Sequence, residues 1–108
     1  MLKLITFIKR KPGMGVDEFH RYWREVHGQI AKKIPGIRKY IQCHTTASGY
    51  QDGKEPLYDG TAEVWFDDLE ALRRSAGTAE YKATMADEAN FIDPALRKFI
   101  ITEEHHVI

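Results

Sequence analysis

Two histidines, His20 and His27, lie seven residues apart in the stretch of this 108-residue chain that is richest in reactive side chains. In a helix, at about 100° per residue, the two rings share one flank, beside the indole of Trp23. An imidazole can take up and release a proton near neutral pH without a cofactor. The pattern predicts proton transfer on a small molecule, as in enolisation, lactone isomerisation, dehydration or ring closure. The structural alternative is a pair of half-buried histidines bonded to the backbone or to water.

Acidic and aromatic side chains elsewhere in the chain complete the predicted site. We predict His27 and Asp93 as the catalytic residues, with the carboxylate orienting the imidazole. Glu63 and Tyr40 are alternative orienting partners, and the structural alternatives are a turn-capping aspartate and two surface or interface residues. The predicted substrate-binding residues, which would form an aromatic-lined cavity and its edge, are His20, Trp23, Tyr40, His44, Trp65 and Phe91.

The spacing of the possible metal ligands argues against a metal centre. His20 and His27 are separated by about 10 Å of helical rise, which is too far to share one ion easily. His105 and His106 are adjacent on an expected strand and therefore point to opposite faces. The single cysteine, Cys43, cannot form an internal disulfide and is expected to be a small buried hydrophobic residue. We therefore expect no metal, no cofactor and a cytoplasmic protein whose fold does not depend on oxidation.

Length and composition indicate a single domain that spans residues 1–108 and has one hydrophobic core. Lys and Arg number 16, as do Asp and Glu, so the formal net charge is zero. This balance gives no electrostatic reason to expect nucleic acid or an anionic membrane as a partner. The apolar run in residues 1–8 is too short for a signal peptide, and no stretch approaches the length of a membrane span.

The segment that carries the two histidines is predicted to be a helix over residues 16–34. Its apolar side chains fall within roughly 80° of the circumference, which is the stripe that a helix needs to pack on a sheet. They are Phe19, Trp23, Val26, Ile30 and Ile34. The remaining pattern predicts strands over residues 2–10, 37–46, 59–66 and within 95–108, helices over 69–76 and 78–90, and a long loop over 47–58. This order predicts an α+β, ferredoxin-like split βαβ fold, with a four-stranded antiparallel sheet and helices on one face.

Two of the predicted strands have faces of different character, and we assign the more apolar face to the helices. In residues 37–46 the inward set is Ile37, Lys39, Ile41 and Cys43, and the outward set is Arg38, Tyr40, Gln42 and His44. In residues 59–66 the inward set is Ala62, Val64 and Phe66, and the outward set is Thr61, Glu63 and Trp65. A sheet face with such aromatic side chains needs a cover, and a second copy of the chain is the simplest one. We therefore predict a homodimer.

Several motifs of the chain resemble those of the EthD family. They are FHRYWREVHG at residues 19–28, PGIRKY at 35–40, YDG at 58–60 with AEVWF at 62–66, ADEANFID at 86–93, and EEH at 103–105. The resemblance covers nearly the whole chain and implies a dimeric α/β barrel, in which two ferredoxin-like subunits pack sheet against sheet. It also implies a pocket position for His27, because the histidine at this place faces the pocket in the related methylmuconolactone isomerases. Gly15 departs from the family, since many members carry a serine cap there.

The sequence thus predicts a homodimeric, cofactor-independent enzyme that acts on a small aromatic or lactone-like molecule through His27. Relatives of the barrel include isomerases, polyketide cyclases, cofactor-free monooxygenases and dehydratases, so the resemblance leaves the reaction type open. Two other classes of function fit the same residues. One is a non-catalytic protein that binds a hydrophobic metabolite, and the other is an accessory partner of an oxidase system.

Overall fold

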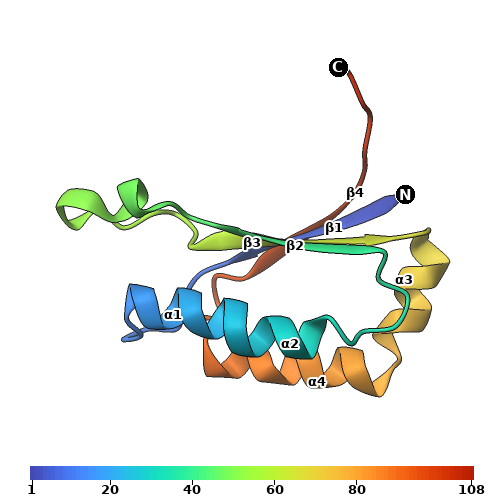
Figure 1. The fold of residues 1–108 in the computed structure, drawn as a ribbon, viewed down its shortest axis with the longest axis horizontal. Helices are drawn as coiled ribbons and strands as arrows, with labels where there is room; N and C mark the ends of the chain where they lie inside the picture. The colour runs from blue at the N-terminus through green and yellow to red at the C-terminus, as the bar shows by residue number, and fades with distance from the viewer.

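Helices cover one face of a four-stranded antiparallel sheet in the computed structural model, which describes residues 1–108 (Figure 1). The strands are β1 (Leu2–Ile8), β2 (Lys39–His44), β3 (Gly60–Phe66) and β4 (Lys98–Glu103), in the spatial order β2-β3-β1-β4. The helices are α1 (Val16–Tyr22), α2 (Gly28–Ala31), α3 (Leu69–Ala76) and α4 (Ala79–Asp87). A π-helical turn, Trp23–His27, joins α1 to α2, and 3₁₀ turns span Ala47–Gly53 and Glu88–Asn90. The predicted α+β, ferredoxin-like fold is confirmed.

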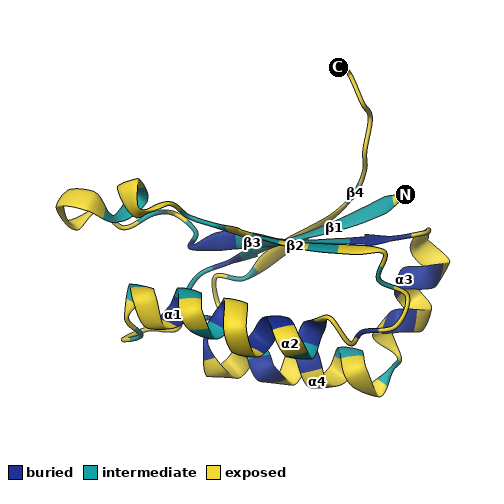
Figure 2. Cartoon of the chain, viewed as in Figure 1, coloured by how far each residue is buried: buried dark blue, intermediate teal, exposed yellow.

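The hydrophobic core lies between the sheet and the helices (Figure 2). Strands β1 and β3 pair in the centre of the sheet, and their inward side chains alternate with outward ones, as the period of a strand requires. The inward set of β3, Ala62, Val64 and Phe66, packs against core residues as predicted. One core cluster consists of Ile8, Phe19, Trp23, Phe91 and Ile92, and a second consists of Phe66, Ala71 and Leu72.

The π-helical turn changes which residues of the long helix face the core. The backbone N–H of Gly28 donates to the carbonyl of Trp23, five residues back, instead of four as in an α-helix. Such a turn holds one extra residue, which rotates the following side chains by roughly 100°. Val26, which the regular helical pattern places in the buried stripe, is therefore 43% exposed, whereas His27 is only 6% exposed. The predicted common flank of His20 and His27 is wrong for the same reason.

The predicted facing of β2 is also wrong. Its Tyr40, Gln42 and His44 side chains face the helices, and the amide of Gln42 donates to the carbonyl of Trp23 at 2.9 Å. Cys43, predicted to be buried, is exposed and lies 3.0 Å from a carboxylate oxygen of Glu63. Polar groups occupy the inward face because they bond a helix carbonyl and border a cavity. The apolar residues of β2 lie on the uncovered face of the sheet instead.

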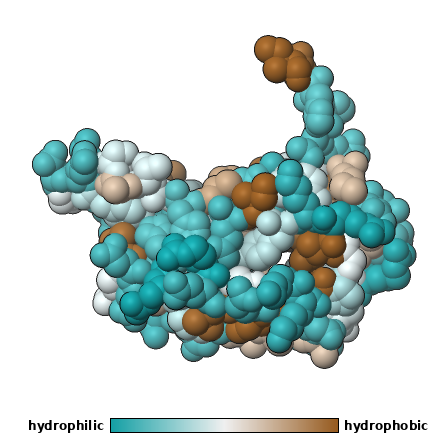
Figure 3. Space-filling model, in the orientation of Figure 1, coloured by the Kyte–Doolittle hydropathy of each residue, from teal (hydrophilic) through white to brown (hydrophobic).

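The face of the sheet opposite the helices carries exposed apolar side chains. Ile41 on β2 and Ile100 on β4 are 38% and 48% exposed, and Trp65 lies on the same face between the ammonium groups of Lys3 and Lys39. After β4 the chain projects away from the domain and ends in an apolar tip, Val107 and Ile108 (Figure 3). None of the helices has the length and apolar character needed to cross a membrane.

Candidate active-site cavity

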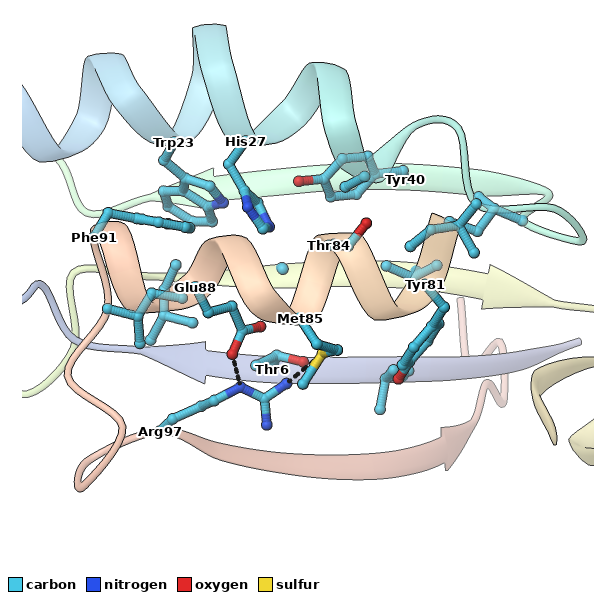
Figure 4. A pocket seen from close by; sticks show the side chains of 18 of the residues that line it. Thr6, Trp23, His27, Tyr40, Tyr81, Thr84, Met85, Glu88, Phe91 and Arg97 are labelled. Carbon is cyan, nitrogen blue, oxygen red and sulfur yellow. Dashed lines mark hydrogen bonds and ion pairs between the residues drawn. The ribbon is translucent and has the colours of Figure 1, made fainter. Parts of the chain in front are cut away.

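A small cavity lies between the helical layer and the sheet, where the π-helical turn, α4 and the central strands meet (Figure 4). Its volume is about 60 Å³, which is room for a few water molecules. Of the 19 residues that line it, 14 are hydrophobic, so the few polar groups in its wall stand out. These polar residues are Thr6, His27, Thr84, Glu88 and Arg97.

The imidazole of His27 points into this cavity (Figure 4). A carboxylate bonds the ring nitrogen on its other side. Nδ1 of His27 lies 2.8 Å from Oδ2 of Asp87, and both side chains are less than a tenth exposed. Because a carboxylate accepts hydrogen bonds, Asp87 selects the tautomer that has its proton on Nδ1. The lone pair of Nε2 is then free to act as a base towards the cavity.

Three donors hold the carboxylate of Asp87 in place. Oδ1 accepts the hydroxyl of Tyr22 at 2.6 Å and the amide of Asn90 at 3.0 Å, while Oδ2 faces His27. Burial alone would raise the pKa of Asp87, but the hydrogen bonds from Tyr22, Asn90 and His27 outweigh it and keep that pKa below its usual value. Asp87 is therefore ionised and ready to stabilise a positive charge on the imidazole.

The wall beside His27 is aromatic. Trp23 and Phe91 are almost completely buried, and the ring centroid of Phe91 lies 4.6 Å from that of His27. On the other side, Tyr40 borders the cavity, and its hydroxyl accepts from the amide of Gln42 at 2.8 Å. Burial raises the pKa of Tyr40, so this phenol stays protonated and can itself donate to a ligand.

A second charged pair lies on the side of the cavity next to β4. Nε of Arg97 is 2.7 Å from Oε1 of Glu88, and the side chains are 19% and 16% exposed. The guanidinium also contacts the thioether sulfur of Met85, at 3.8 Å, and lies 5.8 Å from the ring centroid of Phe99. Burial raises the pKa of Glu88, although Arg97 opposes that effect. The Nη groups of Arg97 thus face no carboxylate of the protein and are available to an anionic oxygen of a ligand.

An apolar groove lies next to the cavity at this side. It has a volume of about 380 Å³ and runs between α3, α4 and β4. The cavity and the groove share Leu4, Tyr81, Met85 and Arg97. Small-molecule sites usually occupy about 300–1,000 Å³, so the groove provides the space that the inner cavity lacks.

A family profile described as the EthD domain matches residues 11–95. The chain belongs to the EthD family. An EthD family protein from Bacillus halodurans C-125 has a TM-score of 0.78 and 28% identity, over 97% of this chain and 99% of that chain. Among proteins with a curated function, none matches this chain.

More distant solved structures share the fold of this EthD domain. A dimeric protein of unknown function from Bacteroides fragilis NCTC 9343 has a TM-score of 0.66 and 20% identity, over 95% of either chain. SnoaB, a cofactor-independent oxygenase from Streptomyces nogalater, has a TM-score of 0.68 and 8% identity, over 99% of this chain and 95% of that chain. At these identities the likeness is one of fold alone.

Two EthD-like motifs of the sequence meet at the His27–Asp87 pair. His27 belongs to the motif at residues 19–28 and Asp87 to the motif at 86–93, and the two residues are 60 positions apart. Sequence reasoning chose the other aspartate of the second motif, Asp93. A signal for Asp87 was present, because residues 84, 87 and 91 share one face of a helix, and Phe91 was already predicted to be in the wall.

Asp93 does not orient His27 in this EthD domain. Its Oδ1 accepts the backbone N–H of Ala95 at 3.0 Å, and its own N–H donates to the carbonyl of Lys9. The residue therefore caps the turn that precedes β4, which was the structural alternative. Proline at position 94 enforces that turn, because it disfavours helical geometry in the residue before it.

The predicted substrate-binding residues divide into two groups. Trp23, Tyr40 and Phe91 line the cavity together with His27. The other three residues, His20, His44 and Trp65, do not line it. His20 and His44 contact each other between α1 and β2, and Trp65 lies on the uncovered face of the sheet, where its Nε1–H donates to Glu104. Glu88 and Arg97 were missed, although Glu88 belongs to the motif at residues 86–93; Arg97 lies outside all the motifs.

Proposed function

We propose that this EthD protein is a homodimeric enzyme in which His27 moves a proton within a small aromatic or lactone-like substrate. The observation that carries the proposal is a buried imidazole that is held at Nδ1 by the ionised Asp87 and turns Nε2 to an apolar cavity. A base oriented by a third group is the general arrangement of side-chain acid–base catalysis. The chemistry needs no cofactor, because the imidazole itself accepts and returns the proton.

The proposed reaction begins with Nε2 of His27 removing a proton from a carbon next to a carbonyl group of the substrate. The C–H electron pair moves into the carbonyl and forms an enolate, while the imidazole becomes an imidazolium. Asp87, at 2.8 Å from Nδ1, stabilises that positive charge. The proton then returns from Nε2 to another atom of the substrate, which completes an isomerisation, or it leaves with a hydroxyl group as water.

Arg97 supports the proposal because it supplies positive charge on the same cavity. An enolate or phenolate oxygen develops negative charge in the transition state, and a preorganised donor in an apolar site stabilises it strongly. The guanidinium of Arg97 forms an ion pair with Glu88 on its Nε side and leaves its Nη groups for that oxygen. The reacting end of the substrate would occupy the inner cavity, and the rest of the molecule would lie in the groove beside β4.

The uncovered face of the sheet supports the homodimer. Ile41 and Ile100 expose apolar surface there, and a second copy of the chain would remove that surface from water. The proteins of similar fold from Bacteroides fragilis and Thermobifida fusca are described as dimeric. In the proposed assembly the two sheets face one another, and each cavity stays on the helical side of its own subunit.

The first experiment is a thermal-shift screen against phenols, quinones, lactones and polyketide-like aromatics. A ligand at 100 times its dissociation constant stabilises the folded state by about 2.7 kcal/mol, which gives a readable shift. Each hit is repeated with His27→Gln and with His105→Gln, whose histidine lies in the exposed C-terminal segment. Hits are then incubated with the protein in D₂O, and exchange of substrate C–H for C–D is followed by NMR.

The proposal expects exchange that His27→Gln abolishes and His105→Gln leaves unchanged. Ligands that bind equally well to all three proteins and never exchange would refute proton transfer. That result would favour the alternative function, a carrier of hydrophobic metabolites, which the largely apolar lining of the cavity also fits. The absence of any ligand would favour the role of accessory partner of an oxidase.

A further inference from the structure

Outside the cavity, four consecutive hydrogen bonds link β2, α1 and the loop of residues 47–58. Oε1 of Gln42 lies 2.8 Å from Nε2 of His44, and Nδ1 of His44 lies 2.7 Å from Nδ1 of His20. Nε2 of His20 lies 2.9 Å from the hydroxyl of Tyr50, which donates to Asp59 at 2.5 Å. Two imidazoles and one phenol thus connect an amide oxygen to a carboxylate.

Both ends of this chain of hydrogen bonds can only accept. Gln42 donates from Nε2 to the carbonyl of Trp23 at 2.9 Å, so its Oε1 must be the atom that faces His44. Asp59 is fully buried and accepts the backbone N–H and the guanidinium of Arg10 at 2.7 and 2.8 Å, as an ionised carboxylate does. Each of the four hydrogen bonds therefore needs a proton from the three residues between the ends.

With both imidazoles neutral, the three residues between the ends have too few protons for all four hydrogen bonds. A neutral imidazole carries one N–H and a phenol one O–H, so His20, His44 and Tyr50 together supply three protons. One additional proton completes the set. Both Nε2 atoms then carry a proton, towards Gln42 and Tyr50, and a single proton lies between the two Nδ1 atoms.

We propose that His20 and His44 bind one shared proton, and that this proton ties the loop of residues 47–58 to α1. The pair is a proton-binding site separate from His27, and it does not depend on the proposed function. Loss of the proton leaves His20 with one N–H for two neighbours. Three protons then serve four hydrogen bonds, so one of the four must break, and Tyr50 on the loop takes part in two of them.

The groups around His20 shift its pKa in opposite directions. Burial lowers the pKa of His20, Asp59 and Asp17 raise it, and Arg24 and Arg10 lower it. The four hydrogen bonds oppose the effect of burial and raise the pKa of the pair, because the complete set forms only in the protonated state. A hydrogen bond to a charged group stabilises by about 1.5–3 kcal/mol, which corresponds to roughly one to two pH units.

A second proton enters the pair only in strongly acidic solution. Burial, the neighbouring charge of His20 and that of Arg24 lower the pKa of His44 to about 4. Two imidazolium groups whose Nδ1 atoms are 2.7 Å apart repel one another, so the first proton excludes the second. The indole of Trp23, whose centroid is 4.1 Å from that of His44, attracts a single positive charge on the pair.

NMR titration of the imidazole nitrogens in the intact protein tests the proposal, with Tyr50→Phe as the decisive variant. The variant removes two of the four hydrogen bonds, those of the Tyr50 hydroxyl with His20 and Asp59, and the one proton that the hydroxyl supplies. The two bonds that remain between Gln42 and His20 are satisfied by neutral rings. We expect the wild type to show one proton uptake common to both rings, with both Nε2 atoms protonated. In Tyr50→Phe the midpoint should fall by about one to two pH units. Tyr58→Phe, which removes a hydroxyl from the same loop, should leave it unchanged.

Hydrogen exchange of the loop provides the second readout. After correction for the intrinsic rate, the amides of residues 47–58 should exchange faster above the common midpoint than below it, and His27→Gln should not alter this. Independent titration of the two rings, or a midpoint that stays or rises in Tyr50→Phe, would overturn the shared proton. Loop exchange that shows no step at the midpoint would overturn the tie between the proton and the loop.

Discussion

Asp87→Asn separates the charge of the proposed dyad from its shape. The substitution keeps the volume of the side chain but replaces an ionised carboxylate, which accepts from Tyr22, Asn90 and His27, with a neutral amide. A hydrogen bond to a charged group stabilises by about 1.5–3 kcal/mol and one between neutral groups by about 0.5–1.5 kcal/mol. Losing that difference over three bonds at a side chain only 9% exposed should cost about 3–4 kcal/mol. For a domain of this size, the melting temperature should fall by roughly 15 °C.

The same substitution should reverse the tautomer of His27. The amide nitrogen introduced at position 87 is a donor, and so are the groups of Tyr22 and Asn90 that face this side chain. The amide should therefore keep its oxygen towards those two groups and turn its nitrogen towards Nδ1 of His27. Nδ1 must then accept, and the proton moves to Nε2, which removes the base from the cavity. NMR of the imidazole nitrogens detects this change without a substrate, and proton exchange of any bound substrate should stop with it.

The effect on stability should depend on pH in a defined direction. The pKa of Asp87 is lowered in the folded protein, so its contribution is present above the unfolded value of about 3.9 and is lost as the pH falls through the folded value. The difference between wild type and variant, measured by denaturant unfolding, should therefore close in acid. Asp93→Asn is the matched control and should leave His27 unchanged. If His27 keeps its proton on Nδ1 in Asp87→Asn, the assignment of the orienting carboxylate is wrong.

Three further substitutions test the fold around the site. Most Gly→Ala changes within a helix stabilise it, but Gly28→Ala should destabilise the protein by about 1 kcal/mol in denaturant unfolding. The new Cβ would lie 3.1 Å from Nε2 of Gln42 and weaken the hydrogen bond from Gln42 to the carbonyl of Trp23. Gly60→Ala should destabilise by about 3 kcal/mol or more, since its Cβ would lie 2.6 Å from the indole of Trp23. Ile41→Asp should shift the protein from dimer to monomer in sedimentation experiments, because it places a charge on the uncovered sheet face.

Each of these substitutions has a control in the same chain. Gly77→Ala lies at a helix end where the nearest contact of a Cβ is 3.6 Å, so it should be neutral or stabilising. If Gly28→Ala behaves in the same way, the close approach of β2 to the π-helical turn is not a constraint. Leu57→Asp changes an exposed loop residue and should leave the oligomeric state alone. A monomeric wild type, or a dimer that survives Ile41→Asp, contradicts the proposed sheet-to-sheet assembly.

The order of elements and the fold class could be predicted from the sequence because they depend on local patterns. A short run with apolar residues on both faces marked β1, and alternation of apolar and polar residues marked β3. The proline–glycine pair at residues 35–36 marked the end of the long helical segment. The cap of α4 by Thr78, whose hydroxyl accepts the backbone N–H of Tyr81, was predictable in the same way. Each of these signals acts over a few residues, so no knowledge of the distant chain was needed.

The inward face of β2 and the π-helical turn could not be predicted, because each depends on the other. The carbonyl of Trp23 accepts both the N–H of Gly28 and the amide of Gln42, and neither contact leaves a periodic signal in the sequence. Hydrophobic periodicity places Val26 inside, but the extra residue of the π-helical turn puts His27 there instead. The prediction that the more apolar face of β2 points to the helices was wrong for a related reason. The inward face of β2 meets a polar partner, the carbonyl of Trp23, and therefore carries polar side chains.

The sequence by itself determined that this chain is an EthD-like α+β domain with His27, Trp23, Tyr40 and Phe91 among its candidate site residues. Only the tertiary structure decided that Asp87, and not Asp93, holds His27, and that Arg97 with Glu88 lies on the same cavity. The physical reason is the range of the interactions. Helices and strands depend on the propensity and periodicity of neighbouring residues. The site, in contrast, is assembled from side chains 60 positions apart, and packing sets their directions.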